Sequence, residues 1–414
     1  FRPPYTPVPI AALGAGGAGQ GLAPERLSPA HPAAIARRAP MIEAGLWRRP
    51  AWFPAPGETD WRAACDRETA MVRNAVGVCD VSTLGKIDVQ GTDAAAFLDR
   101  VYANTISTLA VGRVRYGIML REDGFVMDDG TVARLGARRF LVTTTTAAAG
   151  EVMAHLEFCA QCLWPELDVA TISVTDAWAQ IAVAGPRSRD LLAEVVDGPV
   201  DDAALPYMGH APARIAGIEG RAFRISFSGE RAYELAIPAR WGAALFERLV
   251  ERAAPLGGGP YGMEALNVLR IEKGLLTHAE LHGRTTADDL GLGRMVAAGK
   301  DCVGKVASQR PGLWGPERER LVGLRPRDPS GPIVAGAHLV PPGAEPVAAE
   351  DQGYVTSACF SPTLGHHVAL AFLRDGRARH GETLRAVCRL RGHDTQCEVV
   401  PPVFLDPEGG RLRG

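Results

Sequence analysis

Two adjacent carboxylates, Asp128 and Asp129, are the residues of this chain with the clearest potential for proton-transfer chemistry. They interrupt an apolar run that begins with Phe125-Val126-Met127. Burial of such charges costs free energy unless partners compensate for them. A carboxylate held against a cationic or proton-transferring ligand could act as a general base. The alternative is a surface turn in which both carboxylates face water.

The sequence around these acids predicts a β-hairpin. A strand over Tyr116–Leu120 leads into Asp123-Gly124, a pair that favours a tight type I′ turn, and a return strand follows from Phe125. Successive side chains of a strand point to opposite faces. Only one of the two acids can therefore face a given pocket.

Glu234 is a second candidate, because it lies in a strand whose neighbours Tyr233 and Leu235 are apolar. A carboxylate there could accept two N–H bonds from a planar guanidine-like edge, such as that of a pterin ring. The alternative is a solvent-exposed glutamate on an edge strand. Arg270, on a helix predicted over 261–273, could contact a ligand or pair with a neighbouring carboxylate, and the paired role is favoured.

Other chemistry-bearing patterns are weak. Cys159-Ala-Gln-Cys162 lies in a helical pattern without a second pair, which favours structural thiols over a metal or redox site. His366 and His367 would face opposite sides of a strand and could not easily chelate one metal ion. The chain has no GxGxxG after a strand and no P-loop, so it offers no obvious dinucleotide or nucleoside triphosphate site.

Composition narrows the class of protein. A chain of 414 residues predicts two or three domains, and 46% hydrophobic with 22% charged residues is typical of a globular protein. The net charge of −2 gives no sign of the basic surface that binding to nucleic acid or an anionic membrane requires. No apolar run approaches the roughly 20 residues of a membrane span. Eight scattered cysteines are unlike a disulfide framework, so a reduced, cytoplasmic location is expected.

The chain divides into three parts by composition and periodicity. Residues 1–46 are rich in Pro, Gly, Ala and Arg, and they predict an extended linker or tail. Residues 47–318 contain strands and helices without a regular βαβ period, which predicts an α+β region. Residues 319–414 contain short strands between Pro/Gly turns, which is typical of a small β-barrel or sandwich.

Several motifs in order resemble the glycine-cleavage T-protein (aminomethyltransferase) family. They are Gly77-Val-Cys-Asp-Val-Ser82, Asp-Gly-x-x-x-Asp-Asp at 123–129, Ala184-Gly-Pro186, Ser228-Gly-Glu with Tyr-Glu234, Leu269-Arg-Ile-Glu-Lys-Gly274, and Val355-Thr-Ser with Ser-Pro-Thr-Leu-Gly365. The resemblance covers about residues 60–405. It implies a cloverleaf of two α+β domains and a C-terminal β-barrel around a central folate cavity.

A closer resemblance is to the α subunits of heterotetrameric sarcosine oxidases. Its features are Phe1-Arg-Pro-Pro-Tyr-Thr-Pro-Val8, Ser82-Thr-Leu-Gly-Lys-Ile-Asp88, Arg115-Tyr-Gly117 and 223–230. This resemblance implies that the chain is a C-terminal half whose NAD-binding N-terminal half is absent. It also implies a hetero-oligomer with a flavin-bearing β subunit, carrying FAD or FMN, and smaller subunits.

The resemblance also assigns roles to residues. The acid near the folate nitrogens matches the Asp128/Asp129 pair, with Asp128 favoured. The carboxylate that grips the pterin matches Glu234, and Tyr116 matches an aromatic residue that lines the cavity. Phe227 stands where family members often have Tyr, and Leu266 stands where T-proteins carry Arg.

These implications lead to one main functional hypothesis. Folate bound to this module would capture the methylene carbon that a flavin subunit produces from a sarcosine-like N-methyl amine, and the product would be 5,10-methylenetetrahydrofolate. The folate amine is the nucleophile, so no Ser or Cys is needed. The alternatives are a non-catalytic folate-binding or scaffold subunit and, less favoured, a stand-alone aminomethyltransferase acting on a lipoyl carrier.

Overall fold

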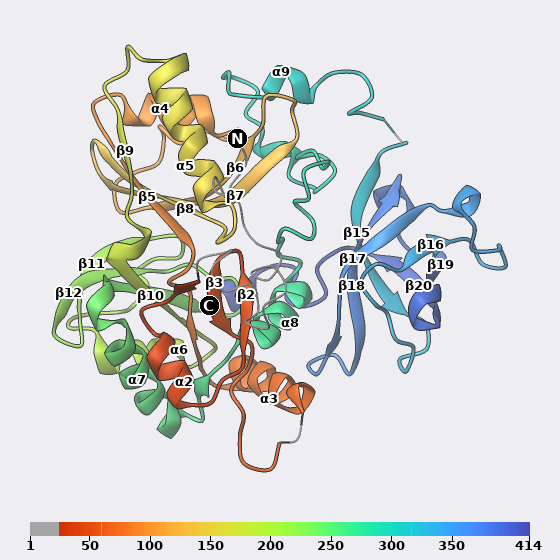
Figure 1. The fold of residues 1–414 in the computed structure, drawn as a ribbon, viewed down its shortest axis with the longest axis horizontal. Helices are drawn as coiled ribbons and strands as arrows, with labels where there is room; N and C mark the ends of the chain where they lie inside the picture. Colours follow the sequence, from red (N-terminus) through yellow and green to blue (C-terminus); the bar gives the residue numbers. More distant parts are fainter. Residues whose placement is uncertain (1–24, 59, 316) are drawn as a thin grey trace, which may run out of the picture.

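The computed structural model describes residues 25–58, 60–315 and 317–414, which form three lobes (Figure 1). Two lobes are built on mixed layers of sheet and helix, and the third is a closed β-barrel. This is the α+β architecture with a C-terminal barrel that the sequence predicted. The Phe-Arg-Pro-Pro-Tyr-Thr-Pro segment lies outside the described residues.

The first lobe contains a six-stranded sheet in the order β11-β12-β13-β10-β4-β14. Helices α6 and α7 pack against its strands, and α3 begins at Asp60, whose side chain accepts a hydrogen bond from the Ala63 amide at 2.9 Å. The elements are β4 (Gly77–Asp80), β10 (Trp178–Ala184), β11 (His210–Ile215), β12 (Ile218–Phe223), β13 (Ala232–Pro238), β14 (Gly259–Pro260), α3 (Trp61–Asn74), α6 (Ser188–Val195), α7 (Gly242–Ala253) and α8 (Met263–Lys273).

Residues 25–50 also belong to this lobe, so the predicted extended linker over 1–46 is wrong for its described part. They form α2 (His31–Ala36) and a small sheet of β1 (Arg26–Leu27), β3 (Trp47–Pro50) and β2 (Met41–Ala44). Ala30, Ala33 and Ala34 are buried against α7 and the six-stranded sheet. Small side chains in such short elements produce no long hydrophobic period, so the sequence pattern concealed them.

The second lobe contains a five-stranded antiparallel sheet in the order β6-β7-β8-β5-β9. Its helices α4 and α5 bury apolar side chains against the sheet. The elements are β5 (Gly85–Gln90), α4 (Ala94–Val101), β6 (Val114–Leu120), β7 (Val126–Gly136), β8 (Arg139–Thr144), α5 (Ala149–Phe158), a π-helical turn η1 (Cys159–Leu163) and β9 (Ala170–Ser173). The whole lobe is therefore inserted between β4 and β10 of the first lobe.

The third lobe is a closed barrel in the order β15-β18-β17-β16-β19-β20, as the sequence predicted. Burial alternates residue by residue along β17, as expected for a strand with one face in a core. The strands are β15 (Glu319–Pro326), β16 (His338–Val340), β17 (Gly353–Ser361), β18 (His366–Arg374), β19 (Thr383–Cys388) and β20 (His393–Val400). Short helices α9 (Lys305–Ser308) and α10 (Gly410–Arg413) lie before and after the barrel.

One apolar cluster joins all three lobes, and we call it the central cluster. It contains Ala182 of β10, Ile118 of β6, Leu269 of α8 and Phe372 of β18. Helix α8 lies between the barrel and the two sheet lobes (Figure 1). It ends at Gly274, whose φ of 73° is left-handed and where a Cβ would come within 2.1 Å of the Pro402 carbonyl oxygen. Side chains that face the central cluster lie at the junction of the lobes.

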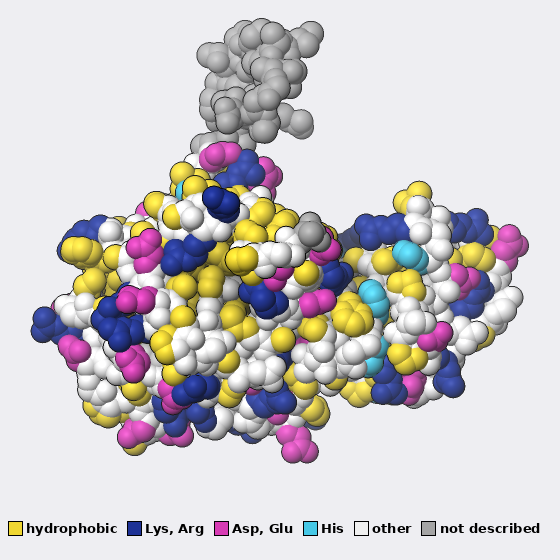
Figure 2. All heavy atoms as spheres, turned by 90° about the horizontal axis from the view of Figure 1, so that it is seen from below, with side chains coloured by type: hydrophobic (Ala, Val, Ile, Leu, Met, Phe, Trp, Pro, Cys, Tyr) yellow, Lys and Arg dark blue, Asp and Glu magenta, His cyan; other side chains and the backbone are white. Residues whose placement is uncertain are grey.

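On the face drawn in Figure 2, acidic and basic side chains are interspersed over the larger part of the molecule, and the barrel stands apart from it. Among the described residues, no helix has the length and apolar character needed to cross a membrane.

Candidate functional site

Asp129 faces the central cluster together with Tyr116. In the β6–β7 ladder Asp129 lies opposite Ile118, a member of the central cluster, and opposed residues of an antiparallel pair share a face. The Tyr116 hydroxyl donates a hydrogen bond to Asp129 Oδ2 at 2.5 Å. Asp129 is 8% exposed, so this carboxylate is nearly dry. The structure brings together two of the residues that the sequence singled out.

Asp128 faces the other side of the same sheet. It lies opposite Met119, which packs with α4 and α5, and it is fully buried. The Thr145 amide donates to Asp128 Oδ2 at 3.0 Å, and the Thr145 hydroxyl donates to Oδ1 at 2.8 Å. The two acids do point to opposite faces, but the register puts Asp129 on the central face rather than the favoured Asp128.

A β-bulge between Met119 and Leu120 fixes which of the two acids takes the central face. One extra residue in β7 shifts the alternation of side chains between Val126 and Asp128. The preceding turn also differs from the predicted type I′. Gly124 is its one described residue with positive φ, 89°, and its amide donates to the Arg121 carbonyl oxygen at 2.9 Å, which fits a type I turn followed by a glycine bulge.

The two acids have raised pKa values because burial disfavours their charged forms. Burial raises the pKa of Asp128 to about 6, although the hydrogen bonds from Thr145 oppose the change. Burial, with the nearby charge of Asp128, raises the pKa of Asp129 to about 7, against the hydrogen bond from Tyr116 and the charge of His278. A group that titrates near neutrality can both accept and release a proton at physiological pH.

The raised pKa of Asp129 predicts a pH-dependent loss of stability. The unfolded chain releases this proton near pH 4, whereas the folded chain keeps it until about pH 7, so the free energy of unfolding falls as pH rises between these values and is level above them. Relative to Asp129→Asn, the wild-type chain is expected to lose up to about 1.4 kcal/mol per pH unit in this window. Urea unfolding at pH 4–8 measures the difference.

Asp123→Asn is the control for this pH series. The hydrogen bond from Arg121 lowers the pKa of Asp123, so its stabilising contribution is lost as pH falls rather than as pH rises. Wild type and Asp129→Asn changing in parallel from pH 4 to 8 would contradict a raised Asp129 pKa.

Glu234 lies on β13 and shares the inner face of the first sheet. It is opposite Ala182, a member of the central cluster, and is 7% exposed. The Gln180 side-chain amide donates to Glu234 Oε2. Burial raises the pKa of Glu234, while Gln180, Lys86 and Arg49 all favour its ionised form. The structure thus contradicts the alternative of a solvent-exposed edge-strand glutamate.

Three polar residues near Glu234 were not predicted from sequence. Gln180 is 2% exposed, and its Oε1 is a buried acceptor without a hydrogen-bond partner in the described part of the chain. Lys86 is fully buried, its Nζ donates to the Ser82 and Leu84 carbonyl oxygens, and burial lowers its pKa to about 8. Polar residues in otherwise apolar strands were the available signal for Gln180 and Lys86; Arg49 gave none.

Phe227 and Arg270 have different surroundings from these acids. Phe227 is 38% exposed in the loop between β12 and β13 and belongs to none of the apolar clusters of the described residues. Arg270 is buried, and its Nη1 donates to Glu280 at 3.0 Å and its Nη2 to Ser357 at 2.7 Å. The favoured pairing of Arg270 with a carboxylate is present, and ligand contacts by either residue stay predictions.

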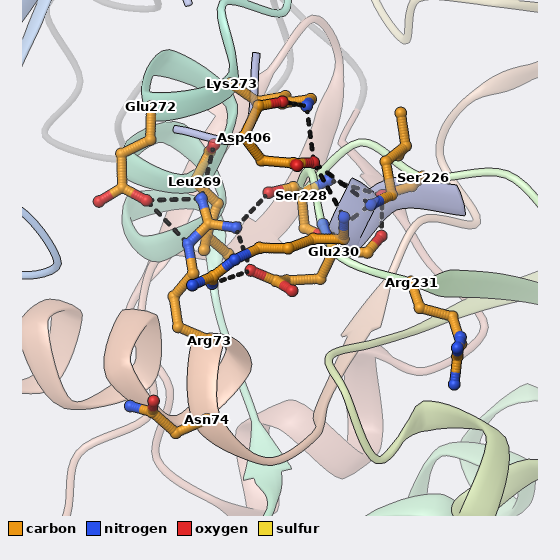
Figure 3. A network of polar contacts seen from close by, with 12 residues as sticks. Arg73, Asn74, Ser226, Ser228, Glu230, Arg231, Leu269, Glu272, Lys273 and Asp406 are labelled. Carbon is orange, nitrogen blue, oxygen red and sulfur yellow. Dashed lines mark hydrogen bonds and ion pairs between the residues drawn. The ribbon is translucent and has the colours of Figure 1, made fainter. Parts of the chain in front are cut away.

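A second buried polar network joins α3, α8 and the β12–β13 loop (Figure 3). Arg73 donates to Glu230 at 2.8 Å and to Glu272 at 2.5 Å, and the Ser361 hydroxyl of the barrel donates to Glu272 at 2.5 Å. All three charged side chains are nearly inaccessible to solvent. Because its members bond to one another across α3, α8, the β12–β13 loop and the barrel, this network has a structural role.

Two cavities lie away from both carboxylate sites. One, of about 340 Å³, adjoins the Arg73 network and is lined by Arg73, Pro186, Glu230, Arg231, Arg411 and Gly414. The other, of about 510 Å³, is lined by residues of α6 and the β11–β12 turn together with Arg248. The central folate cavity implied by the sequence resemblance stays a prediction.

Comparison with known proteins agrees with this architecture. The GCVT N-terminal domain model matches residues 30–300, and the glycine cleavage T-protein C-terminal barrel domain model matches residues 319–406. The aminomethyltransferase T of the Bartonella henselae glycine cleavage system has a similar solved structure. Its TM-score is 0.78 at 24% identity, with 92% of this chain and 98% of that chain covered, so it supports the fold.

Curated relatives give the same result by sequence. A sarcosine oxidase subunit alpha from Rhizobium meliloti is 50% identical over 100% of this chain, and one from Corynebacterium sp. strain P-1 is 42% identical. The chain spans less than half of these two relatives, 42% and 43% of their lengths. An aminomethyltransferase from Streptomyces avermitilis is 33% identical over 81% of this chain and 88% of that protein. The resemblance predicted from the motifs is confirmed: the chain belongs to the glycine cleavage T-protein family.

Proposed function

We propose that this chain is the folate-dependent one-carbon transfer module of a sarcosine oxidase-like complex. The observation that carries the proposal is a pair of nearly dry carboxylate sites, Asp129 with Tyr116 and Glu234 with Gln180, on the inner faces of two sheets that meet at the central cluster. The similarity to proteins named sarcosine oxidase subunit alpha and aminomethyltransferase supports it.

The residues present fit tetrahydrofolate. Glu234 Oε2 is fixed by Gln180, and the cationic side chains of Lys86 and Arg49 favour the ionised carboxylate that a donor-rich pterin edge requires. Gln180 Oε1, which has no hydrogen-bond partner among the described residues, adds a second acceptor beside Glu234. Glu234 would therefore hold and orient the pterin, with Gln180 positioning Glu234.

Asp129 would handle protons during the transfer. Bound tetrahydrofolate would supply the two amine nitrogens that take the carbon, so two N–H protons must leave them and two must reach the departing amine. Asp129, with a pKa near 7 and its orientation fixed by Tyr116, can accept a proton from a folate nitrogen and return it to the leaving amine. Its negative charge also stabilises a cationic form of the reacting carbon.

The longer relatives suggest the context of this module. We infer that the chain corresponds to the C-terminal part of an α subunit whose N-terminal half binds NAD. A partner β subunit with FAD or FMN would oxidise a sarcosine-like N-methyl amine to the imine whose carbon is captured here. Smaller subunits would complete the hetero-oligomer, and a cytoplasmic location fits this metabolic role.

Calorimetric titration with tetrahydrofolate under anaerobic conditions tests the binding site. Glu234→Gln keeps the shape of the side chain and removes its charge, so the affinity is expected to fall about 10- to 100-fold, the cost of losing hydrogen bonds to a charged group. Glu219→Gln, an exposed residue on β12, is the matched control and should bind like the wild type.

Absence of tetrahydrofolate binding by the wild-type chain, alone and with a flavin subunit present, would contradict the proposal. The non-catalytic scaffold would then be the better function. One observation favours that alternative: Leu266, at the position where T-proteins carry Arg, is buried in the central cluster and offers no charged contact to a folate tail.

A further inference from the structure

A chain of hydrogen bonds leads from the surface to the buried Asp128. The Thr145 hydroxyl donates to Asp128 Oδ1 at 2.8 Å and lies 3.0 Å from His278 Nε2. His278 is exposed in the segment after α8, whereas Asp128 has no exposed surface. Three residues from different parts of the sequence thus connect solvent to the interior.

The hydrogen bonds that link His278, Thr145 and Asp128 have a defined direction. A threonine hydroxyl has one hydrogen and can also accept. While Asp128 is ionised, the hydrogen of Thr145 Oγ1 is directed to its carboxylate, and His278 can then only donate its Nε2–H to the same oxygen. The direction is therefore from imidazole to hydroxyl to carboxylate, which is the order required to carry a proton inward.

Several charged and titratable groups lie near Asp128, the inner end of these hydrogen bonds. Asp129 follows Asp128 on β7, and the charge of Glu151 on α5 raises the pKa of Asp128. The charge of Asp128 in turn raises the pKa of Tyr102, which follows α4, and of Tyr116 on β6. The charge of His278 lowers the pKa of Asp129. Asp128 and Asp129 are therefore electrostatically linked, although they lie on opposite faces.

We propose that His278, Thr145 and Asp128 form a proton relay that exchanges protons between solvent and the buried carboxylate pair during one-carbon transfer. The proposal rests on the proposed function. A proton delivered to Asp128 removes its negative charge, which weakens the hold of Asp129 on its own proton and favours delivery of that proton to the leaving amine. Return of the proton to solvent through Thr145 and His278 restores the base for the next turnover.

The relay is tested in the full-length protein assembled with its flavin-bearing partner. The readout is the rate of 5,10-methylenetetrahydrofolate formation as a function of pH. We expect His278→Gly and Thr145→Val to lower this rate about 10-fold, less than the 10²–10⁴-fold of a direct acid–base group, with the KM for tetrahydrofolate unchanged. Added imidazole should restore the rate of His278→Gly, and Thr145→Ser should retain the wild-type rate.

His380→Gly is the matched control, since His380 is exposed on the barrel, and it should have the wild-type rate without a response to imidazole. If the wild type forms no methylenetetrahydrofolate, the proposed function itself fails, and the relay with it. If the wild type is active but His278→Gly and Thr145→Val match it at every pH, only the relay is wrong. A slow, folded His278→Gly whose pH profile is unchanged and which imidazole does not rescue would show a structural role and also overturn the relay.

Discussion

Asp129→Asn is expected to slow one-carbon transfer by about 10²–10⁴-fold, the usual contribution of a positioned acid–base group. The asparagine keeps the size of the side chain and can still accept the hydrogen bond from Tyr116, but it cannot take a proton from a folate nitrogen. The affinity for tetrahydrofolate should change only slightly, because we assign binding of the pterin to Glu234. Single-turnover formation of 5,10-methylenetetrahydrofolate in the assembled protein, with calorimetry alongside, separates the two effects.

Asp128→Asn is the natural comparison, because the neighbouring carboxylate has the same chemistry and faces the opposite side of the sheet. It should slow transfer less than Asp129→Asn does, to about the level of Thr145→Val. The opposite order, with Asp128→Asn the slower variant, would show that the acid favoured from sequence is the reacting one and that the register argument fails.

Arg73→Met is expected to lower the free energy of unfolding by about 3–5 kcal/mol, the range for breaking a buried ion pair. Arg73 is the common partner of Glu230 and Glu272 (Figure 3). Its loss leaves Glu272 buried without a cationic partner in the described part of the chain, while Glu230 keeps Arg411 at 3.0 Å. Glu272 would retain only the Ser361 hydroxyl as a side-chain donor among the described residues. Urea denaturation, with the slope checked for two-state behaviour, measures the change.

Arg248→Met is the control for this loss. Arg248 and Glu251 form an exposed pair at 3.4 Å on α7, and exposed pairs contribute about 0–1 kcal/mol. An Arg73→Met variant no less stable than Arg248→Met would mean that the network contributes specificity rather than stability. The double variant Arg73→Met with Glu272→Met should recover part of the loss, because a buried charge is then removed along with its partner.

Local pattern was sufficient for much of the fold. Short strands between Pro/Gly turns predicted β structure from 319 onward, and the family resemblance implied that these strands form a barrel. The alternation of side chains along a strand predicted that Asp128 and Asp129 point to opposite faces. The motif order identified the family, and an acid in an apolar strand drew attention to Glu234.

Long-range packing decided what local pattern could not. A single bulge in β7 places Asp129 on the central face. No residue type near Met119 predicts the extra residue that forms this bulge. Gln180 bonds to Glu234 because β10 and β13 are neighbours in the first sheet, whereas Lys86 acts on its charge from the second lobe and Arg49 from the small sheet of β3. Residues 25–50 form part of the first lobe because their small side chains fit against it, which their own periodicity does not reveal.

The sequence by itself determined which residues could do chemistry and which family they belong to, because both depend on residue type and spacing. The tertiary structure decided which acid faces the junction of the lobes, what fixes Glu234, and that His278 reaches Asp128 through Thr145. Thr145 and His278 are 133 positions apart in the sequence, and only the folded chain brings them within hydrogen-bond distance. Burial then sets their pKa values, since desolvation depends on the surrounding fold and not on neighbours in sequence.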